Sequence, residues 1–195
     1  FRHEAFEQYK AQREETPEAI RLSVPIIKDI IRAYRIPILE VAGYEADDVI
    51  GTLATEAGRQ GITTYMMTPD KDYGQLVSDK VFMYRPKHTG GFEVMGVEAQ
   101  VIDMLGLMGD SSDNIPGCPG VGEKTAQKLI SEFGSIENLL EHTDQLKGAL
   151  KTKVETNREM ITFSKFLATI KIDVPIQLEM DSLVREEADE DSLRS

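Results

Sequence analysis

Short apolar runs separated by turn residues characterise the first half of the chain, a pattern that predicts strands. The last two of four such runs read as a hairpin around the turn Thr89-Gly90-Gly91. The four predicted strands are 36–41, 62–68, 81–84 and 92–95.

Apolar residues at helical spacing lie between these runs. One predicted helix begins at Thr16-Pro17-Glu18 and is kinked or restarted at Pro25. Two more are predicted over 45–60 and 101–108, with a short helical or looped segment beginning at Leu76. Strands that alternate with helices favour an α/β fold, a mostly parallel sheet flanked by helices.

The second half is predicted to be helical. A tight glycine-rich hairpin over 116–122 precedes a helix over 123–133, which Gly134 ends. Ser135 caps a following helix over 136–140, and the segment 147–170 is basic and amphipathic. From Asp181 onward the chain is an acidic tail with few core-forming residues.

Composition limits the class of protein. The 195 residues are 41% hydrophobic, enough for one sizeable domain or a domain with an appendage. Cys118 is the only cysteine, so no internal disulfide can form, and we expect a cytoplasmic protein. No apolar run has membrane-spanning length, and the first residues do not resemble a signal peptide, so no membrane partner is expected.

The net charge of −12 argues against a nucleic-acid partner, but its distribution weakens that objection. Residues 179–195 hold seven acids and two bases, which leaves −7 for the remaining chain. Seven carboxylates in three short motifs account for that charge. They are Glu45, Asp47 and Asp48, Asp70 and Asp72, and Asp110 and Asp113.

Each acidic motif falls where an apolar segment meets a loop, the place where open α/β sheets build active sites. Repulsion opposes gathering this much like charge, and divalent cations would remove it. Carboxylates without His or Cys suit Mg²⁺ or Mn²⁺ rather than Zn²⁺. Taken singly, the motifs have simpler explanations: acids are favoured at helix N-termini, and Asp-Lys-Asp is a common solvated turn.

The segment Gly120-Val121-Gly122-Glu123-Lys124-Thr125 is a candidate phosphate-binding hairpin. Glycines let backbone approach a phosphate, and the helix N-terminus behind them offers free N–H groups. Lys128, one turn after Lys124, can add charge along a nucleic-acid strand, without sequence specificity. The alternative is a plain packing corner between helices. A Walker-type loop is excluded by the spacing.

Lys10 and Arg13, three residues apart in the basic N-terminal segment, are candidate phosphate-contacting residues. On spacing alone, a solvated basic face is the simpler interpretation.

In combination, these residues resemble the 5′-nuclease (flap endonuclease) superfamily, and within it the 5′→3′ exonuclease domains of bacterial DNA polymerases I. The matching stretches span nearly the whole chain. They are Phe1-Arg2-His3-Glu4, 9–13, 43–51, Asp70-Lys71-Asp72, 107–117 and 120–126.

The resemblance implies a two-metal nuclease that hydrolyses DNA phosphodiesters in primer removal and repair. Glu45 and Asp47 would serve one Mg²⁺ or Mn²⁺, and Asp70, Asp72 and Asp113 a second. Asp48 and Asp110 would take supporting positions within the metal site. Lys10 and Arg13 would steady the scissile phosphate at the base of a helical arch.

The hairpin would correspond to the family's helix–hairpin–helix, which grips duplex DNA and often holds K⁺. Its predicted DNA-binding residues are Gly117, Gly120, Gly122, Lys124, Thr125 and Lys128. The implied partners are DNA (5′ flaps, nicked or gapped duplex, RNA primer–DNA) and polymerase domains of the same parent chain. The implied domains are an α/β nuclease core over 1–109 with the arch at 1–21, a helix–hairpin–helix subdomain over 110–175, and an acidic linker over 176–195.

Two departures from the family pattern stand out. The family's first strand and a second Asp that precede Phe1 are absent from this sequence, and Val97–Gln100 resembles a splice across a shorter connection. We therefore expect weak or absent cleavage by this chain. The alternatives are a DNA-binding fragment without catalysis, a structural module packed on a polymerase, and a free-standing flap endonuclease.

Overall fold

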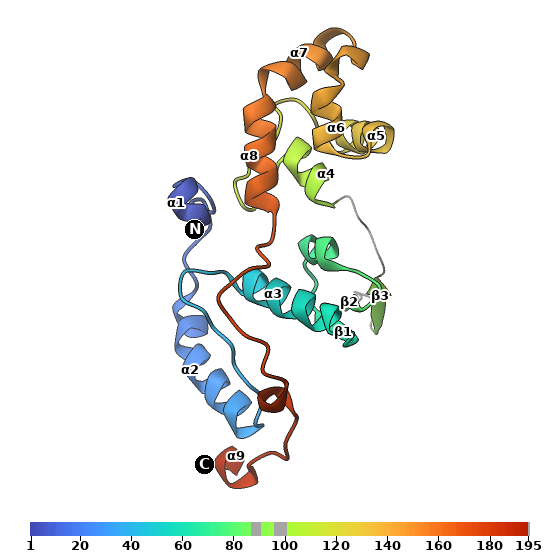
Figure 1. Cartoon of the computed structure of the whole chain (residues 1–195). Helices are drawn as coiled ribbons and strands as arrows, with labels where there is room; N and C mark the ends of the chain where they lie inside the picture. The colour runs from blue at the N-terminus through green and yellow to red at the C-terminus, as the bar shows by residue number, and fades with distance from the viewer. Residues whose placement is uncertain (87–90, 96–100, 195) are drawn as a thin grey trace.

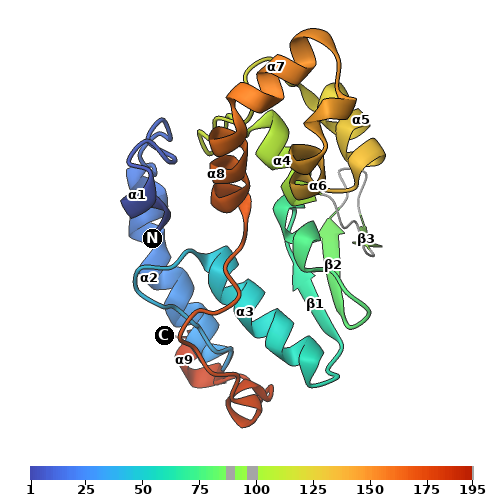
Figure 2. The same cartoon turned by 45° about the horizontal axis from the view of Figure 1, so that its top comes forward.

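A computed structural model of the protein describes residues 1–86, 91–95 and 101–194 (Figure 1). Most of the turn at 89–91 and the connection at 97–100 lie outside the described residues. A sheet with its covering helix forms one part of the molecule, a group of short helices forms a second, and the N-terminal helices with the last helix lie beside the sheet part (Figure 1). The second view shows the helical part joined to the sheet part by the chain that leaves α8 (Arg158–Ala168) (Figure 2).

The sheet has three strands in the order β1-β2-β3 within the described residues. β1 (Thr64–Met67) is parallel to β2 (Val81–Pro86), and β2 is antiparallel to β3 (Phe92–Met95). The hairpin that the sequence predicts is therefore present. The α/β class is confirmed, with one parallel and one antiparallel pairing.

α3 (Ala46–Arg59) covers one face of this sheet. Met66, Val81 and Met83 point into the core beneath it, where Ala54 of the helix also lies. The opposite face carries exposed apolar side chains: Tyr65 is 59% exposed and Met67 73%. The alternation along β1 therefore separates a covered face from an open one.

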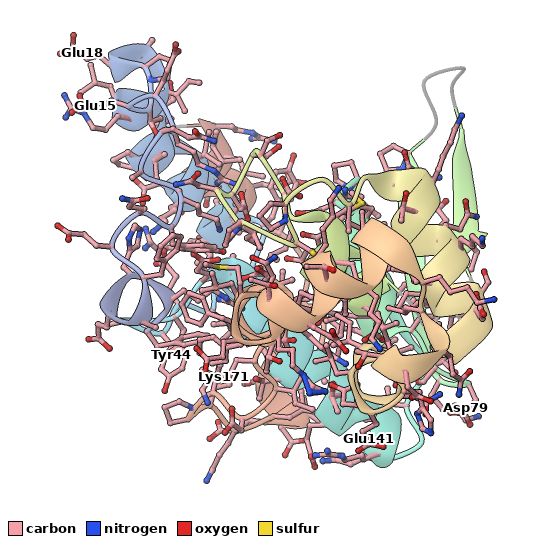
Figure 3. The ribbon with its side chains drawn as sticks, turned by 90° about the horizontal axis from the view of Figure 1, so that it is seen from above. Glu15, Glu18, Tyr44, Asp79, Glu141 and Lys171 are labelled. Atoms are coloured by element: carbon pink, nitrogen blue, oxygen red, sulfur yellow. The ribbon has the colours of Figure 1, made fainter. Side chains whose placement is uncertain are left out.

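The N-terminal segment comprises α1 (Arg2–Ala5) and α2 (Glu18–Ala33). α2 runs through Pro25 as one element, so the expected restart there does not occur. Glu15 and Glu18 mark the outer end of this segment when the molecule is seen from above (Figure 3).

The strand predicted over 36–41 is wrong: these residues form no strand and pair with none of the described ones. Ile36 and Leu39 are 53% and 43% exposed, so this apolar run is not a buried element. Pro37 removes a ladder donor from the run, and an apolar run without an adjacent strand has nothing to pair with.

The short helical or looped segment expected to begin at Leu76 is a helix that ends there, and the acidic tail contains short helices that the sequence does not predict. The remaining elements are all helical, with the segment 147–170 divided into two helices at Asn157. They are η1 (Lys71–Leu76), α4 (Val101–Met108), α5 (Glu123–Phe133), α6 (Ile136–Glu141), η2 (Thr143–Gln145), α7 (Gly148–Thr156), α8 (Arg158–Ala168), η3 (Met180–Leu183) and α9 (Glu190–Arg194).

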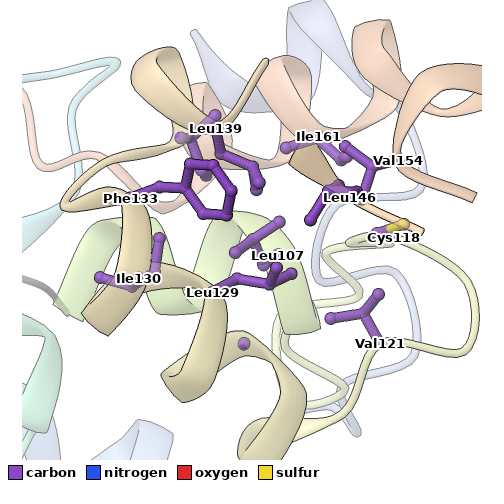
Figure 4. Close-up of a cluster of buried hydrophobic side chains, with 12 residues drawn as sticks. Leu107, Cys118, Val121, Leu129, Ile130, Phe133, Leu139, Leu146, Val154 and Ile161 are labelled. Carbon is purple, nitrogen blue, oxygen red and sulfur yellow. The ribbon is translucent and has the colours of Figure 1, made fainter. Parts of the chain in front are cut away.

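A second core lies among the C-terminal helices (Figure 4). Leu107 of α4 packs there with Leu129 and Phe133 of α5 and with Ile161 of α8. Cys118 is buried in the same cluster, in keeping with a structural role. α4 lies before the domain boundary expected after residue 109, yet it shares this core with the helices that follow. That domain boundary therefore remains a prediction.

Gly109 and Gly117 bring two segments of backbone into direct contact. Both have positive φ, and a Cβ on Gly117 would lie 2.3 Å from the backbone nitrogen of Gly109. This close approach fixes the loop that carries Asp110 and Asp113 against the start of the hairpin.

After α8 the chain returns along α3 as a strap, residues 169–174. Gln75 and Thr52 hold it: the Gln75 side chain accepts from the Ile170 amide at 2.8 Å, and the Thr52 hydroxyl accepts from the Val174 amide at 3.2 Å. The strap thereby connects the C-terminal helices to the α/β part. No described helix is long and apolar enough to cross a membrane.

Candidate metal and DNA-binding site

The N-terminal end of α3 carries the first acidic motif. Glu45 is the N-cap residue, Asp47 lies in the first turn, and the backbone N–H of Glu45 donates to Asp48 Oδ2 at 3.2 Å. Acidic side chains at this end of a helix interact favourably with its dipole and its free N–H groups. Burial, and then the charges of Glu45 and Asp48, raise the pKa of Asp47.

Asp48 is fully buried and paired with Arg2, which is itself only 3% exposed. Two guanidinium nitrogens of Arg2 donate to the two Asp48 oxygens, at 2.9 and 2.8 Å. The Lys171 N–H donates to Asp48 Oδ1 at 2.8 Å. Burial alone would raise the pKa of Asp48, but the hydrogen bonds from Arg2 and Lys171 bring it below its usual value. With both oxygens engaged, Asp48 is not free to be a direct metal ligand in this arrangement, and the supporting position expected for it stays a prediction.

The other two motifs face a common groove of about 550 Å³. Its lining includes all four of their acids, Asp70, Asp72, Asp110 and Asp113, together with Arg13. Asp110 Oδ1 accepts from the Ser112 N–H at 2.7 Å, so one of its oxygens serves the loop itself. The groove thus collects acids from two motifs that lie 38 to 43 positions apart in the sequence.

Asp72 carries an unpaired carboxylate oxygen in this groove. Its Oδ1 is buried and has no hydrogen-bond partner within the described part of the chain. Burial, followed by the charge of Asp70, raises the pKa of Asp72 to about 6, and Asp110 and Asp113 act in the same direction. A buried acceptor among like charges is the chemistry that a divalent cation satisfies.

Lys10 connects the two groups of acids. Its ammonium donates to Glu45 Oε2 at 2.7 Å and lies 3.6 Å from Asp113 Oδ2. Arg13 forms an ion pair with the other Asp113 oxygen. Burial would lower the pKa of Lys10, but its hydrogen bonds to Glu45 and Tyr9 keep it above the usual value. Lys10 and Arg13, the two basic residues predicted for the site, therefore contact acids that were also predicted for it.

The acidic side chains fit a divalent cation by type, because they are hard oxygen donors and one of them is an orphaned buried oxygen. As they lie, however, no three acidic, histidine or cysteine side chains within the described residues are close enough to hold an ion. The two cationic side chains, Lys10 and Arg13, instead neutralise Glu45 and Asp113.

The glycine-rich hairpin borders the same groove through Gly122 and Glu123. Gly122 has open space around it, and Lys124 and Lys128 are exposed on α5, whose first turn Thr125 also occupies. Gly120 has positive φ and its carbonyl accepts from Lys153 Nζ at 3.4 Å. Gly117 packs on the backbone of Gly109, and Gly120 lies against the Lys153 side chain, so among these three glycines it is Gly122 that faces open space.

Two residues of the site were not assigned a role from the sequence. Arg2 pairs with Asp48, and the buried Tyr9 places its hydroxyl 3.4 Å from Glu45 and 3.5 Å from Asp113. Burial raises the pKa of Tyr9 to about 12. Both lie in stretches that carry the family resemblance, which is the signal that could have indicated them.

The chain belongs to the 5′-3′ exonuclease family. The family's N-terminal resolvase-like domain matches residues 1–106, and its C-terminal SAM fold matches residues 97–191. Among curated proteins, DNA polymerase I of Bacillus caldotenax is 42% identical over 205 aligned residues, covering 99% of this chain and 23% of that protein. DNA polymerase I of Bacillus subtilis is 45% identical over 197, covering 94% and 22%. The chain thus spans less than a quarter of the length of these relatives.

Solved structures share the fold. The T5 5′-exonuclease with bound divalent metal ions (zinc) superposes with a TM-score of 0.67 at 23% identity, over 86% of this chain and 69% of that one. The catalytic core of Rad2 in complex with DNA substrate superposes with a TM-score of 0.58 at 17% identity, over 94% and 66%. The α/β core followed by a helical subdomain is therefore the fold of a known group of nucleases.

Proposed function

We propose that this domain is a metal-dependent 5′→3′ exonuclease and 5′-flap endonuclease that hydrolyses DNA phosphodiesters. The observation that carries the proposal is the orphaned, buried oxygen of Asp72 in a groove shared with Asp70, Asp110 and Asp113. Family membership and the metal-bound T5 relative support it.

Two ions, Mg²⁺ or Mn²⁺, would be held by Glu45 and Asp47 on one side and by Asp70, Asp72 and Asp113 on the other. Such ions supply Lewis-acid stabilisation of the phosphoryl oxygens and lower the pKa of the attacking water. Because the carboxylates stand apart in the structure, their side chains would move together around the ions. Asp110 and Asp48 would support the arrangement from behind.

Lys10 and Arg13 would contact the scissile phosphate. Each forms an ion pair with Asp113 of the groove, so a phosphate held by ions there would lie within their reach. Positive charge placed where negative charge develops in the transition state lowers the barrier to cleavage.

The hairpin would hold the DNA backbone through the N–H groups around Gly120 and Gly122, with Lys124, Thr125 and Lys128 adding contacts along the strand and Gly117 shaping the turn. Carbonyls of the turn would be available to a K⁺ ion. Contacts to phosphates alone give affinity without sequence preference and strong dependence on salt.

For the whole protein, we propose a cytoplasmic, bacterial DNA polymerase I that removes RNA primers and processes flaps, nicks and gaps. The support is identity of 40% or more to such polymerases over nearly all of this chain. The runner-up is a DNA-binding fragment without catalysis, favoured by the absence of a ready ion site among the described residues. A free-standing flap endonuclease is the third possibility, in keeping with the T5 relative.

A labelled 5′-flap duplex with Mn²⁺ tests the proposal. We expect cleavage near the flap junction, abolished in Asp113→Asn while DNA binding is kept or strengthened. Asp29→Asn, at an exposed acid on α2, is the matched control and should cleave as the wild type does. DNA binding that depends on Lys124 and Lys128, with no cleavage in any metal, would establish the runner-up instead.

A further inference from the structure

The side chain of Arg2 makes hydrogen bonds to two parts of the molecule. Besides the paired bonds to Asp48, its Nη2 donates to the Thr169 carbonyl at 2.7 Å and its Nε to the Leu167 carbonyl at 3.1 Å. Thr169 and Leu167 lie where α8 ends and the strap begins. One guanidinium therefore connects the acidic end of α3 to the helical subdomain.

Asp48 passes this connection to the candidate metal-binding acids. It accepts from the Glu45 backbone N–H, so it fixes the residue at the start of α3, and Arg2 itself lies 3.5 Å from Glu45 Oε2. The strap also reaches the same carboxylate through the Lys171 N–H, close to Tyr44 (Figure 3). Asp48 is thus a junction between strap, α1 and α3.

We propose that Arg2 is a positioning residue that holds the acids at the start of α3 in a fixed relation to the hairpin subdomain. Through Asp48 it determines both metal affinity and which phosphodiester enters the groove. The effect on which phosphodiester enters the groove rests on the proposed nuclease function, and the effect on metal affinity does not.

Physical reasons favour arginine here over lysine. A planar guanidinium can donate to both carboxylate oxygens and to two carbonyls at once, whereas an ammonium cannot reproduce that fork. Partners that orient metal ligands from behind are costly to lose, by about 10- to 100-fold in metal affinity or activity. The strap's other side-chain anchors also touch the acidic motifs: Thr52 donates to the Asp48 carbonyl and Gln75 to the Asp72 carbonyl, each at 2.8 Å. By contrast, the exposed Asp173 on the strap pairs with Lys171 and takes no part in these bonds.

This difference provides a matched control. Arg2→Lys should weaken Mn²⁺ binding to the full chain, measured by electron paramagnetic resonance without DNA, by about 10-fold or more. On a 5′-labelled flap, kcat should fall, KM should stay within about twofold, and products should spread over neighbouring positions. Asp173→Asn removes the strap's exposed ion pair with Lys171 without touching Asp48 or the groove, and should keep wild-type Mn²⁺ affinity and cleavage position.

The double variant Arg2→Gln/Asp48→Asn removes both buried charges and guards against a variant that fails to fold, because unpaired buried charge is what destabilises most. The proposal predicts that this double variant folds and still binds Mn²⁺ weakly. Wild-type affinity in a folded Arg2→Lys or double variant, or an equal loss in Asp173→Asn, would overturn it. If the wild type binds Mn²⁺ but never cleaves DNA, the proposed function fails, and the affinities alone decide the role of Arg2.

Discussion

The ammonium of Lys10 lies 2.7 Å from a carboxylate oxygen of Glu45, in the place where the sequence leads one to expect a metal ion. The backbone N–H of Lys10 also donates to the Asp113 carbonyl at 3.0 Å. The loop that carries Lys10 is therefore bonded both to Glu45 and to Asp113. A resident lysine charge offsets the repulsion between these acids and competes with any cation for them.

Lys10→Met is therefore expected to bind Mn²⁺ more tightly than the wild type, while cleaving flap DNA at least about 100-fold more slowly. Removing the competing charge leaves Glu45 free for the ion, and the phosphate loses a cation. Calorimetric titration with Mn²⁺ and single-turnover cleavage measure the two effects. Lys28→Met is the control, since Lys28 pairs with Glu40 at the same 2.7 Å but away from the groove. Weaker Mn²⁺ binding by Lys10→Met would contradict this prediction.

The raised pKa of Asp72 has a consequence for stability. In the folded state this carboxyl takes up a proton near pH 6, whereas in the unfolded chain it does so near its ordinary value of 3.8. The folded state therefore binds more protons between these two values, and the contribution of Asp72 to stability falls as the pH rises through that window.

In chelator at pH 7.5, Asp72→Asn should consequently have a higher melting temperature than the wild type, with the difference shrinking toward pH 4. Mg²⁺ should raise the melting temperature of the wild type, since it binds the folded state, and should raise that of Asp72→Asn by less, because this variant loses a ligand of one of the two proposed ions. Thermal unfolding by circular dichroism measures both. An Asp72→Asn protein that is less stable in chelator at pH 7.5 would show that this carboxylate is not under repulsion.

The glycines of the hairpin should separate packing from DNA contact. Gly117→Ala is expected to destabilise the fold by roughly 2–4 kcal/mol, because its Cβ would overlap backbone of residues 108–109 at a positive φ. Gly122→Ala, with open space and φ of −95°, should unfold at the wild-type denaturant concentration. Gly122→Ala should instead bind duplex DNA more weakly than the wild type, as measured by fluorescence anisotropy. Equal unfolding midpoints for the two variants would contradict this.

Salt dependence should identify the lysines of α5 as phosphate contacts. Lys124→Ala and Lys128→Ala are each expected to reduce the slope of log affinity against log salt by about 1, with little change between DNA sequences. Lys80→Ala, on the loop before β2 and outside the groove, should leave the slope unchanged. An unchanged slope in both α5 variants would remove α5 from the DNA interface.

Local patterns predicted most of the fold. The helices at 46–59 and 123–133 have clear apolar stripes and N-terminal signals, and they form where expected. The run at 36–41 misled because apolar character indicates burial only when another element covers it. The seven acids could be grouped by chemistry, but their pairing with cations could not, since Arg2 meets Asp48 across 46 positions and Leu167 across 165.

The open side of the sheet has a practical meaning for work in solution. Tyr65 and Met67 present aromatic and thioether surface on one strand, stacked in part on Phe82. Sheets with parallel pairing are ordinarily covered on both faces, so the open face of this sheet favours contact with other apolar surfaces. Concentrated samples of this chain in sulfate-rich buffer will tend to self-associate, and dilute, low-sulfate conditions suit measurements on it.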